Sequence, residues 1–398
     1  MQQKNHSLIL TINSGSTSLK VGLFDCENQT FILKGNIERI GLAQSFFRLR
    51  NQEDQTVIEE CFQLKDHDEA IAKLFGFLRK NKFDENLLAV GHRIVHGGLL
   101  YSEPRLITSE TVDNLKELVA FAPEHLPSQI LAIESFRKQI PHVKNVGCFD
   151  TAFHRTIPFY ARWYALPKPI RDMGIVRYGF HGLSCEYVME ELKKTEKEKA
   201  LGKVIIAHLG GGASMTAVYN GQSIDTTMGF SPLSGLVMET RCGDLDPGAV
   251  LYLVKEKGLT ASEVYNLLNS RSGLLGISGI SSDMKELIED TTKEAEQAIE
   301  VFVYQAKKHL GALVAILNGL DILVFTGGIG EHSALIRKRI CENLDFLGIR
   351  LDPLRNESNK ETISKENSPS KIKIIKANEE LVIAQKTFKL ISQGSLTL

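Results

Sequence analysis

Residues 7–25 read SLILTINSGSTSLKVGLFD, and residues 203–219 read KVIIAHLGGGASMTAVY. Each segment has an apolar run, a turn rich in small residues and a second apolar run, which is the pattern of a β-hairpin. The second hairpin follows the first by about 190 residues, and this spacing indicates a duplicated domain. We therefore expect two related halves that enclose a cleft.

Around the hairpins, helical spacing alternates with short apolar runs, and this alternation predicts an α/β fold. The expected helices cover residues 69–81, 108–120, 127–139, 248–257, 261–270, 292–317, 334–344 and 379–392. The expected strands cover residues 87–95, 143–149, 321–326 and 372–375, and the polar segment 356–371 is expected to be a surface loop. We place the domain boundary near residue 150, because the first hairpin and the strand that ends at Asp150 can then share one sheet.

The composition excludes several classes of protein. The chain has 398 residues, 43% hydrophobic and 24% charged, which is enough for two or three domains with a sizeable core. A formal charge of -1 leaves no basic surplus for a nucleic acid or an anionic membrane. No apolar run reaches the roughly 18 residues of a membrane span, and the amino terminus lacks a signal-peptide core. The six scattered cysteines form no CxxC pair, so we expect reduced thiols in a cytoplasmic protein.

Three glycine-rich segments are candidates for phosphate or nucleotide binding. They are NSGSTSLK at residues 13–20, HLGGGAS at residues 208–214 and TGGIGEHS at residues 326–333. Backbone N–H groups, hydroxyls and the point charge of Lys20 suit oxyanions. An ordinary hairpin turn is the alternative for the first two segments. The third follows an expected strand, but Ser333 replaces the last glycine of a dinucleotide-binding fingerprint, so a dehydrogenase is a weak alternative.

Charged residues beside glycines and at a strand end are candidates for catalysis. Arg93, in GHRIVHGG, could grip a carboxylate or phosphate with two N–H groups, or form a salt bridge inside the sheet. His92 and His96 have the spacing of a zinc pair on a helix, but the β-branched residues between them favour a strand. Asp150 could hold magnesium, orient a nucleophile or cap a helix.

Three further candidates stand in the second half and at the closing helix. His181 lies between glycines in YGFHG, where a structural histidine is the alternative. Arg241 belongs to the long charged loop 225–248, and we interpret it as a second anion clamp. Glu379 follows Asn378 at the start of the closing helix, where capping alone would explain both.

In these segments the chain resembles the acetate kinases, the acetokinase family of the actin-like sugar-kinase superfamily. The resemblance covers essentially all 398 residues. It rests on ten motifs in the family's order: INSGSTSLK, GHRIVHGG, CFDTAFH, YGFHG, HLGGGAS, DTTMGFSPLSGL, TRCGDLDPG, GLLGISG, FTGGIGEHS and ANEELVIA. It implies reversible transfer of the ATP γ-phosphoryl to acetate, giving ADP and acetyl phosphate, with Mg²⁺, or Mn²⁺ as the alternative metal.

The resemblance also implies an architecture. The fold would be α/β, with two actin-like, ribonuclease H-like domains and a nucleotide cleft between them. The first domain would comprise residues 1–150, with the closing helix 384–398 packed on it. The second, residues 151–383, would bind nucleotide and form most of a homodimer. Small-molecule substrates, no nucleic acid and no membrane are the implied partners.

Site residues are implied position by position. Catalytic roles fall on Asp150, His181, Arg241 and Arg93, and magnesium-related positions are Asn13, Glu379 and Asp150. The carboxylate substrate would meet Arg93, Val95, His125, Phe180 and Pro232. The nucleotide would meet Lys20, Ser16, Ser18, His208, Leu209, Gly210, Gly211, Gly212, Asp283, Met284, Lys285, Gly328, Ile329, Gly330, Glu331 and His332.

The sequence departs from the family pattern at five positions. Gly211 stands for the usual Asn, Glu239 for Gly, Lys285 for Arg, His332 for Asn and Glu124 for an apolar residue near the acyl group. Lys285 lacks the planar stacking of arginine, so the choice of nucleotide stays open. Burial of an unpaired carboxylate is costly, so we expect Glu124 to face solvent or to find a partner.

Two alternatives to acetate kinase activity follow. A propionate or butyrate kinase would differ in the volume of the acyl pocket. A non-catalytic actin-like nucleotide switch would not need Arg93, Arg241 and Asp150 together.

Overall fold

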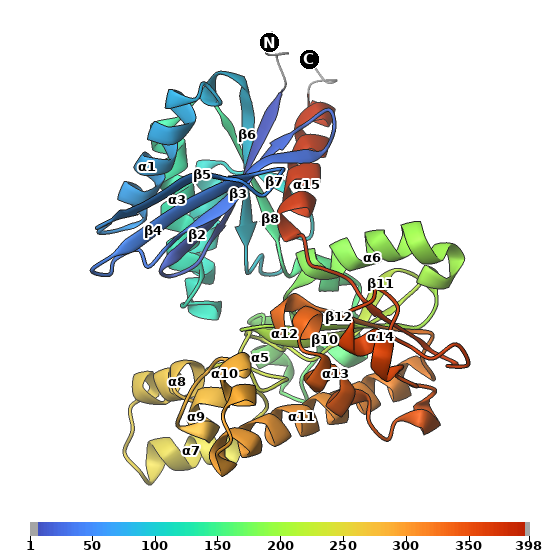
Figure 1. The fold of residues 1–398 in the computed structure, drawn as a ribbon. Coiled ribbons are helices and arrows are strands. Elements are labelled where there is room, and N and C mark those ends of the chain that lie inside the picture. Colours follow the sequence, from blue (N-terminus) through green and yellow to red (C-terminus); the bar gives the residue numbers. More distant parts are fainter. Residues whose placement is uncertain (1–6, 395–398) are drawn as a thin grey trace. The chain divides into compact units, whose positions relative to one another are not determined.

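The computed structural model describes residues 7–394 and divides into two compact units (Figure 1). Unit 1 comprises residues 1–152 and 378–398, and unit 2 comprises residues 153–377. The chain returns to unit 1 at Asn378 rather than at residue 384, because α15 (Glu379–Gly394) is one continuous helix. Asn378 caps this helix, since its Oδ1 accepts a hydrogen bond from Leu381 N at 3.2 Å. Residues 395–398 of the expected closing helix lie outside the described residues.

Unit 1 is built on one sheet with the strand order β5-β4-β3-β2-β1-β6-β8-β7. Its strands are β1 (Leu8–Ser14), β2 (Ser18–Asp25), β3 (Thr30–Glu38), β4 (Ser45–Asn51), β5 (Thr56–Phe62), β6 (Leu87–Ile94), β7 (Arg105–Leu106) and β8 (Lys144–Phe149). Strand β1 pairs antiparallel with β2 and parallel with β6, and β6 pairs parallel with β8. The carboxyl ends of β1, β6 and β8 therefore lie at one edge of the sheet.

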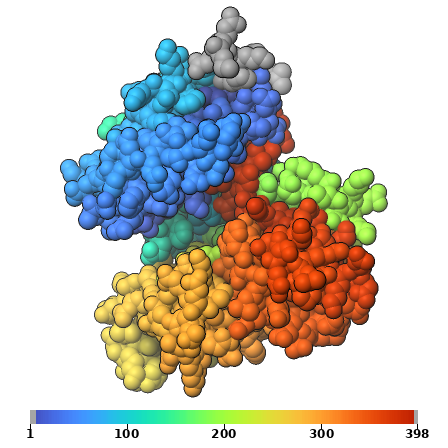
Figure 2. Space-filling model, in the orientation of Figure 1, coloured from blue at the N-terminus to red at the C-terminus, as the bar shows by residue number. Residues whose placement is uncertain are grey.

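Helices cover both faces of this sheet. They are α1 (His67–Lys80), α2 (Ser109–Glu117), α3 (Leu126–Gln139) and α15. Alternate side chains of β1 point to opposite faces of the sheet. Leu8, Leu10 and Ile12 join the core that includes residues of α1 and α3, whereas Ile9 packs with Ala384 of α15 on the other face. Figure 2 shows the consequence within unit 1, where the blue amino-terminal and red carboxy-terminal segments pack side by side.

The sheet of unit 2 has the strand order β11-β10-β9-β12-β13. Its strands are β9 (Val204–Leu209), β10 (Ala213–Tyr219), β11 (Gln222–Thr226), β12 (Ile322–Thr326) and β13 (Lys371–Ile374). The antiparallel and parallel pairings match those of β3-β2-β1-β6-β8 in unit 1, strand for strand. The duplication expected from the two hairpins is thus confirmed.

The helices of unit 2 are α4 (Phe159–Arg162), α5 (Lys168–Asp172), α6 (Gly182–Glu196), α7 (Pro247–Lys255), α8 (Ala261–Ser270), α9 (Gly273–Ser278), α10 (Met284–Glu289), α11 (Lys293–Leu317), α12 (Gly327–His332), α13 (Ala334–Cys341) and α14 (Pro353–Glu357). The short 3₁₀ helices of the chain are η1 (Asp84–Asn86), η2 (Leu118–Phe121), η3 (Ala152–Thr156), η4 (Lys197–Leu201) and η5 (Asp345–Leu347). Within residues 7–394, no helix has the length and apolarity needed to cross a membrane.

The segment 356–371 is more than the expected surface loop. Ile363 is buried, and its N–H donates to Ile372 O at 2.8 Å. Isolated bridges pair Thr362 with Lys373 and Leu351 with Ser364. The segment therefore covers β13, although its composition is polar.

Candidate active site

Four candidate side chains of unit 1 meet at the carboxyl ends of the parallel strands. Arg93, on β6, donates from Nε and Nη2 to Asp150 Oδ2 at 3.0 and 2.5 Å. Its Nη1 donates to Asn13 Oδ1 at 3.2 Å, and its Nε lies 3.7 Å from Glu379 Oε2. Burial acts to lower the pKa of Arg93, but Asp150 and Glu379 together raise it above its ordinary value, so the guanidinium stays charged.

Parallel pairing explains why these residues converge. Asp150 directly follows β8, and its N–H donates to Ile94 O of β6 at 2.9 Å. Asp150 is completely buried, while Arg93 is partly exposed. The carboxylate is therefore held by a charged partner, and the guanidinium stays partly exposed.

The donor set of this group fits magnesium. Mg²⁺ prefers oxygen ligands and usually takes one or two carboxylates together with phosphate oxygens and water. Asn13, Asp150 and Glu379 supply an amide oxygen and two carboxylates around one guanidinium. The residues that the structure describes contain no cluster of three or more His, Cys, Asp or Glu side chains that could hold a metal.

The phosphate-binding candidates of the first hairpin lie beside this group. Lys20 faces Asn13 in the register of β1 and β2 and is exposed, as is Ser16 in the turn; Ser18 is half-buried. The turn between the two strands comprises only residues 15–17. His67, which sequence reasoning missed, hydrogen-bonds through Nε2 to Gly15 O at 2.8 Å and holds this turn.

Glu380, next to Glu379 in the first turn of α15, is a further acidic residue near this group. Burial raises the pKa of its carboxyl, as does the neighbouring charge of Glu379, while Lys20 and Arg93 act in the opposite direction. It therefore adds a carboxyl to the surroundings of Arg93. The charged run Asn378-Glu379-Glu380 was the visible signal, but helix capping explained it equally well.

The acyl-pocket candidates of unit 1 lie in loops next to the Arg93 strand. Val95 is buried, and its N–H donates to the side-chain oxygen of Gln129 at 3.0 Å. His125 is the residue before α3 and is half-buried. Glu124 is exposed to solvent, which is one of the two outcomes expected for its charge.

In unit 2, His181 and Arg241 meet at the glycine turn that joins β9 to β10. A Cβ placed on Gly212 would lie 3.1 Å from His181 Nε2 and 3.2 Å from Arg241 Nη2, so both side chains lie against this glycine. His181 adopts a left-handed conformation (φ 58°) directly before α6 and hydrogen-bonds through Nδ1 to Ser214 Oγ at 2.9 Å. Its ring stacks on His208 with centroids 4.2 Å apart.

Arg241 and the neighbouring pocket candidates are fixed by backbone contacts. Arg241 Nη1 donates to Pro232 O at 2.7 Å. Phe180 is buried, and its carbonyl accepts a hydrogen bond from His154 Nε2 at 2.8 Å. The first bond lies within the long loop 225–248, and the second joins the residue before His181 to His154 of η3.

The second and third glycine-rich segments lie against each other. Thr326, at the end of β12, pairs with His208 on β9. A Cβ on Gly210 would lie 3.5 Å from Gly328 N, and a Cβ on Gly327 would lie 2.7 Å from Leu209 O. Gly327 has a φ of +77°, which disfavours a side chain at this position. Together, residues 208–212 and the start of α12 form one surface of exposed and half-buried glycines, including Gly211 and Gly328.

The remaining residues predicted to contact the nucleotide differ in their exposure to solvent. Asp283 and Lys285 are exposed, and Asp283 Oδ1 accepts from Lys285 N at 2.7 Å at the start of α10, whereas Met284 is buried. His332 is exposed and Ile329 half-buried. The carboxylate of Glu331 accepts from Gly327 N at 3.0 Å and Ala377 N at 2.8 Å, so it holds the start of α12 from within the protein.

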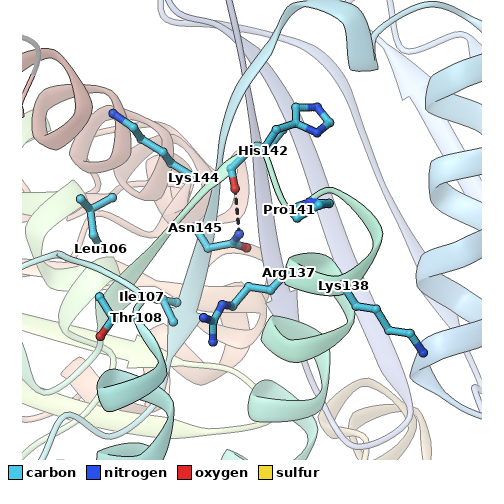
Figure 3. Close-up of a pocket in the computed structure, with 10 residues that line it drawn as sticks. Leu106, Ile107, Thr108, Arg137, Lys138, Pro141, His142, Lys144 and Asn145 are labelled. Carbon is cyan, nitrogen blue, oxygen red and sulfur yellow. Dashed lines mark hydrogen bonds between the residues drawn. The ribbon is translucent and has the colours of Figure 1, made fainter.

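A separate cavity of unit 1, about 550 Å³ in volume, lies away from these groups (Figure 3). Its basic lining residues are Arg137, Lys138, His142 and Lys144. Lys144 begins β8, about 20 Å along the strand from Asp150. Lys138 and Lys144 point to opposite sides of the cavity in Figure 3, and Arg137 is engaged by Ser109 Oγ at 3.2 Å. Nothing but charge marks this cavity as a binding site.

His92 and His96 lie on a strand and in the loop that follows it, as the β-branched residues between them indicated. His92 lies on β6 and bonds through Nε2 to Asn145 Oδ1 at 2.7 Å. His96 Nδ1 accepts from Gly98 N at 3.0 Å in the loop that follows. Both histidines are buried and shape the strand end that carries Arg93.

Comparison with known proteins gives matches along nearly the whole chain. A family model described as the Acetokinase family matches residues 8–385. An acetate kinase of Methylocella silvestris is 41% identical over 403 aligned positions, which cover 97% of this chain and 98% of that protein. Acetate kinase 2 of Clostridium perfringens is 42% identical over 398 positions, covering 97% of this chain and all of that protein.

Solved structures of acetate and propionate kinases have the same fold as this chain. A propionate kinase from Francisella tularensis superposes with a TM-score of 0.91 at 38% identity, covering 96% of this chain and 98% of its own. An acetate kinase from Porphyromonas gingivalis gives 0.87 at 35% identity, covering 97% and 100%. These neighbours share the actin-like sugar-kinase type of fold that the resemblance implied. With the matched motifs, the duplicated sheets and these relatives taken together, the chain belongs to the acetokinase family.

Proposed function

We propose that this protein is an acetate kinase, which reversibly transfers the γ-phosphoryl group of ATP to acetate and gives acetyl phosphate and ADP. The observation that carries the proposal is family membership over residues 8–385 together with intact charged groups in both units. Arg93, Asp150 and Arg241 are all present and held in place by named contacts. A nucleotide switch without phosphoryl transfer would not need this set.

In unit 1, Arg93 binds the carboxylate substrate. Its Nη1 and Nη2 are two planar donors, which match the two oxygens of a carboxylate. Acetate is already ionised near neutral pH, so no general base is needed for attack. Asp150 orients Arg93 and, with Asn13 and Glu379, holds Mg²⁺. The metal, when bound, neutralises phosphate charge.

In unit 2, the glycine surface binds the nucleotide phosphates through backbone N–H groups. His181 and Arg241 offset the charge that develops on the three equatorial oxygens of the moving phosphoryl. An acetate oxygen forms the new bond to the γ-phosphorus, and the bond from that phosphorus to the bridging oxygen of ADP breaks in line. The protein supplies alignment and charge neutralisation, and no covalent intermediate is required.

We also propose a cytoplasmic homodimer that uses Mg²⁺ in preference to Mn²⁺. The oxygen-only donor set of Asn13, Asp150 and Glu379 supports a hard divalent cation. All six cysteines are free, which suits a reducing compartment. The membership of the family supports the homodimer.

Propionate kinase activity is the second candidate, because a structure with that title superposes well on this chain. Trapping of acyl phosphates with hydroxylamine measures the choice directly, with acids of two, three and four carbons and with ATP or GTP. We expect the highest kcat/KM for acetate with ATP. A higher value for propionate would contradict the acetate assignment, and no hydroxamate with any acid would contradict the kinase assignment.

The two arginines should be indispensable for turnover. We expect Arg241→Ala to lose about 3 kcal/mol or more of transition-state stabilisation, roughly a hundredfold or more in kcat. Arg93→Ala should lose activity and also stability, because buried Asp150 loses its charged partner. The double variant R93A/D150N should regain melting temperature but not activity. Near-normal turnover of Arg241→Ala would remove that residue from the mechanism.

A further inference from the structure

Two histidines and two serines of unit 2 form a reciprocal pair of hydrogen bonds between the start of α6 and the β9–β10 hairpin. His181, directly before α6, bonds through Nδ1 to Ser214 Oγ on β10 at 2.9 Å. In return, Ser184 Oγ on α6 bonds to His208 Nδ1 on β9 at 2.8 Å. The two rings stack, with an angle of 20° between their planes. The helix start and the hairpin thus each contribute one imidazole and one hydroxyl.

Both serines have fixed positions. Ser184 is completely buried in the first turn of α6. Ser214 is also buried, and its backbone pairs with that of His208 in the register of β10 and β9. His181 has a left-handed backbone, which a residue other than glycine keeps only where the surrounding contacts hold it. The reciprocal bonds supply such contacts, so they fix the orientation of the His181 ring.

The bond at Nδ1 determines which nitrogen of His181 meets a ligand. The opposite nitrogen, Nε2, faces the same glycine turn as Arg241 Nη2, since a Cβ on Gly212 would lie close to both atoms. A phosphoryl oxygen at this turn only accepts hydrogen bonds. The Nε2 atom must therefore carry a hydrogen when it meets that oxygen.

A hydroxyl partner at Nδ1 meets this requirement in both protonation states of the ring. When the imidazole is neutral with its hydrogen on Nε2, the Ser214 hydroxyl can donate to Nδ1. When the ring is charged, Nδ1–H donates to Ser214 Oγ instead. A carboxylate in the place of this hydroxyl would only accept, so it would draw the hydrogen of a neutral ring to Nδ1. Ser214 therefore keeps Nε2 of His181 able to donate.

We propose that Ser214 is a positioning residue for phosphoryl transfer, which holds the His181 ring with Nε2–H turned towards the phosphoryl group beside Arg241. Ser184 supports this arrangement through His208, because the stacked ring of His208 limits how far His181 can tilt. The inference rests on the proposed function, in which His181 and Arg241 offset the charge of the moving phosphoryl group. It adds two serines that act through histidines and not on the substrate itself.

The test separates turnover from substrate binding. Values of kcat and of KM for ATP and acetate are measured by hydroxylamine trapping for the wild-type chain and for Ser214→Ala. We expect kcat to fall about ten- to a hundredfold, as for a misplaced reacting group, while both KM values change by less than about threefold. A wild-type kcat in Ser214→Ala overturns the proposal.

Ser370→Ala is the matched control. Ser370 is as buried as Ser214 and belongs to unit 2, but its Oγ donates to Leu320 O at 2.8 Å, at the beginning of β12 and not at its glycine-rich end. The control removes a buried hydroxyl with one hydrogen bond and should keep the wild-type kcat. An equal loss of kcat in both variants contradicts a specific role for Ser214.

A double-variant cycle distinguishes positioning from a merely structural role. In a His181→Ala background, Ser214→Ala should lower kcat by less than about twofold, because the ring through which it acts is absent. An undiminished loss in that background contradicts action through His181. Ser184→Ala should lower kcat less than Ser214→Ala does, since it reaches His181 only through the stacked ring. A larger loss for Ser184→Ala contradicts this order of action.

Failure of the inference and failure of the proposed function give different results. If His181→Ala loses kcat while Ser214→Ala retains it, only the role of Ser214 fails. If His181→Ala keeps the wild-type kcat, the role of His181 in transfer fails and the inference fails with it. If the wild-type chain forms no hydroxamate with any acid, the kinase assignment itself fails.

Discussion

Two completely buried histidines have their pKa lowered to about 4 by burial, partly offset by hydrogen bonds. His154, in unit 2, bonds to Phe180 O through Nε2 and to Ser223 Oγ through Nδ1 at 3.0 Å. His92, in unit 1, bonds to Asn145. Each ring is neutral in the folded protein at physiological pH, and the carbonyl partner of His154 requires its proton to be on Nε2.

These histidines predict loss of stability in acid. Between about pH 4 and pH 6.5 the unfolded chain binds protons that the folded chain excludes, so stability rises with pH in this window and falls as pH drops through it. For one such histidine, the free energy of unfolding is lower by on the order of 3 kcal/mol once the pH is well below both pKa values. Melting temperatures at pH 7.5, 6 and 5 should fall less steeply for His154→Gln than for the wild type. His142→Gln, at an exposed position, should retain the wild-type slope, and equal slopes for both variants would refute the assignment.

The residue scale also shows the limits of reading the sequence. Arg93, Asp150 and Arg241 could be singled out from the sequence because each is a charged residue beside glycines or at a strand end, although a salt bridge or a helix cap also suited Arg93 and Asp150. Gln129 and His67 are invisible, because their contacts with Val95 and Gly15 join segments far apart in sequence. The close approach of Glu239 to Gly211, on which a Cβ would lie 2.7 Å from Glu239 Oε2, is of the same kind. Each departure could be noted alone, but only the fold brings the two together.

At the element scale, α12 depends on a buried cation from the next helix. Arg337, on α13, is completely buried and makes five hydrogen bonds, to Gly330 O, Glu331 O, Asn356 Oδ1 and O, and Asn359 Oδ1. Burial lowers its pKa to about 10, so it is still charged at neutral pH. All five acceptors are neutral oxygens. Arg337 therefore ties the end of α12 to the segment that contains α14.

Removal of this cation should loosen the nucleotide-binding segment. We expect Arg337→Met to cost about 3 kcal/mol or more, because several buried carbonyls lose their donor. Hydrogen exchange of residues 327–332 should rise, and KM for ATP should rise with it. Arg339→Met, two residues along the same helix, removes only the exposed ion pair with Glu296 and should cost less than about 1 kcal/mol. Similar effects of the two variants would contradict a role for Arg337 in holding α12.

Element types were predictable where periodicity was long and clear. The helix over 292–317 and the strand over 321–326 each appear within one residue of the expected bounds. The segment 356–371 was misjudged because its composition is polar, while its pairing with β13 runs through backbone hydrogen bonds such as that from Ile363 N to Ile372 O. Short apolar elements in polar surroundings carry too little pattern to be recognised.

At the scale of the whole molecule, the two units should respond to different ligands. Unit 1 holds Arg93 and Val95, and unit 2 holds the glycine surface with His181 and Arg241. We expect hydrogen exchange with MgADP alone to show protection at residues 208–212 and 327–332. Acetate added afterwards should protect residues 93–98. A protein whose nucleotide protection falls in unit 1 instead would contradict the assignment of sites to units.

The duplicated topology was the part of the fold that the sequence indicated best, since both hairpins carry the same strand and glycine pattern. The point of return to unit 1 was placed six residues late, because acids at a helix start look alike in either unit. Only the ion-pair partner of such an acid shows which unit its helix packs on. Glu379 pairs with Arg93, which belongs to unit 1.

Because of helix α15, unit 1 is formed by two segments that lie far apart in the sequence. A Cβ placed on Gly91 would lie only 2.3 Å from Thr387 Oγ1, so β6 and this helix pack closely against each other. During synthesis on a ribosome, however, the strands emerge more than two hundred residues before their covering helix. One apolar face of the nascent sheet, including Ile9 and Phe24, must wait uncovered while all of unit 2 is translated. The folding of unit 1 can therefore be completed only when the last segment of the chain has been translated. A chaperone would matter most while unit 2 is being translated and this face of the sheet is exposed.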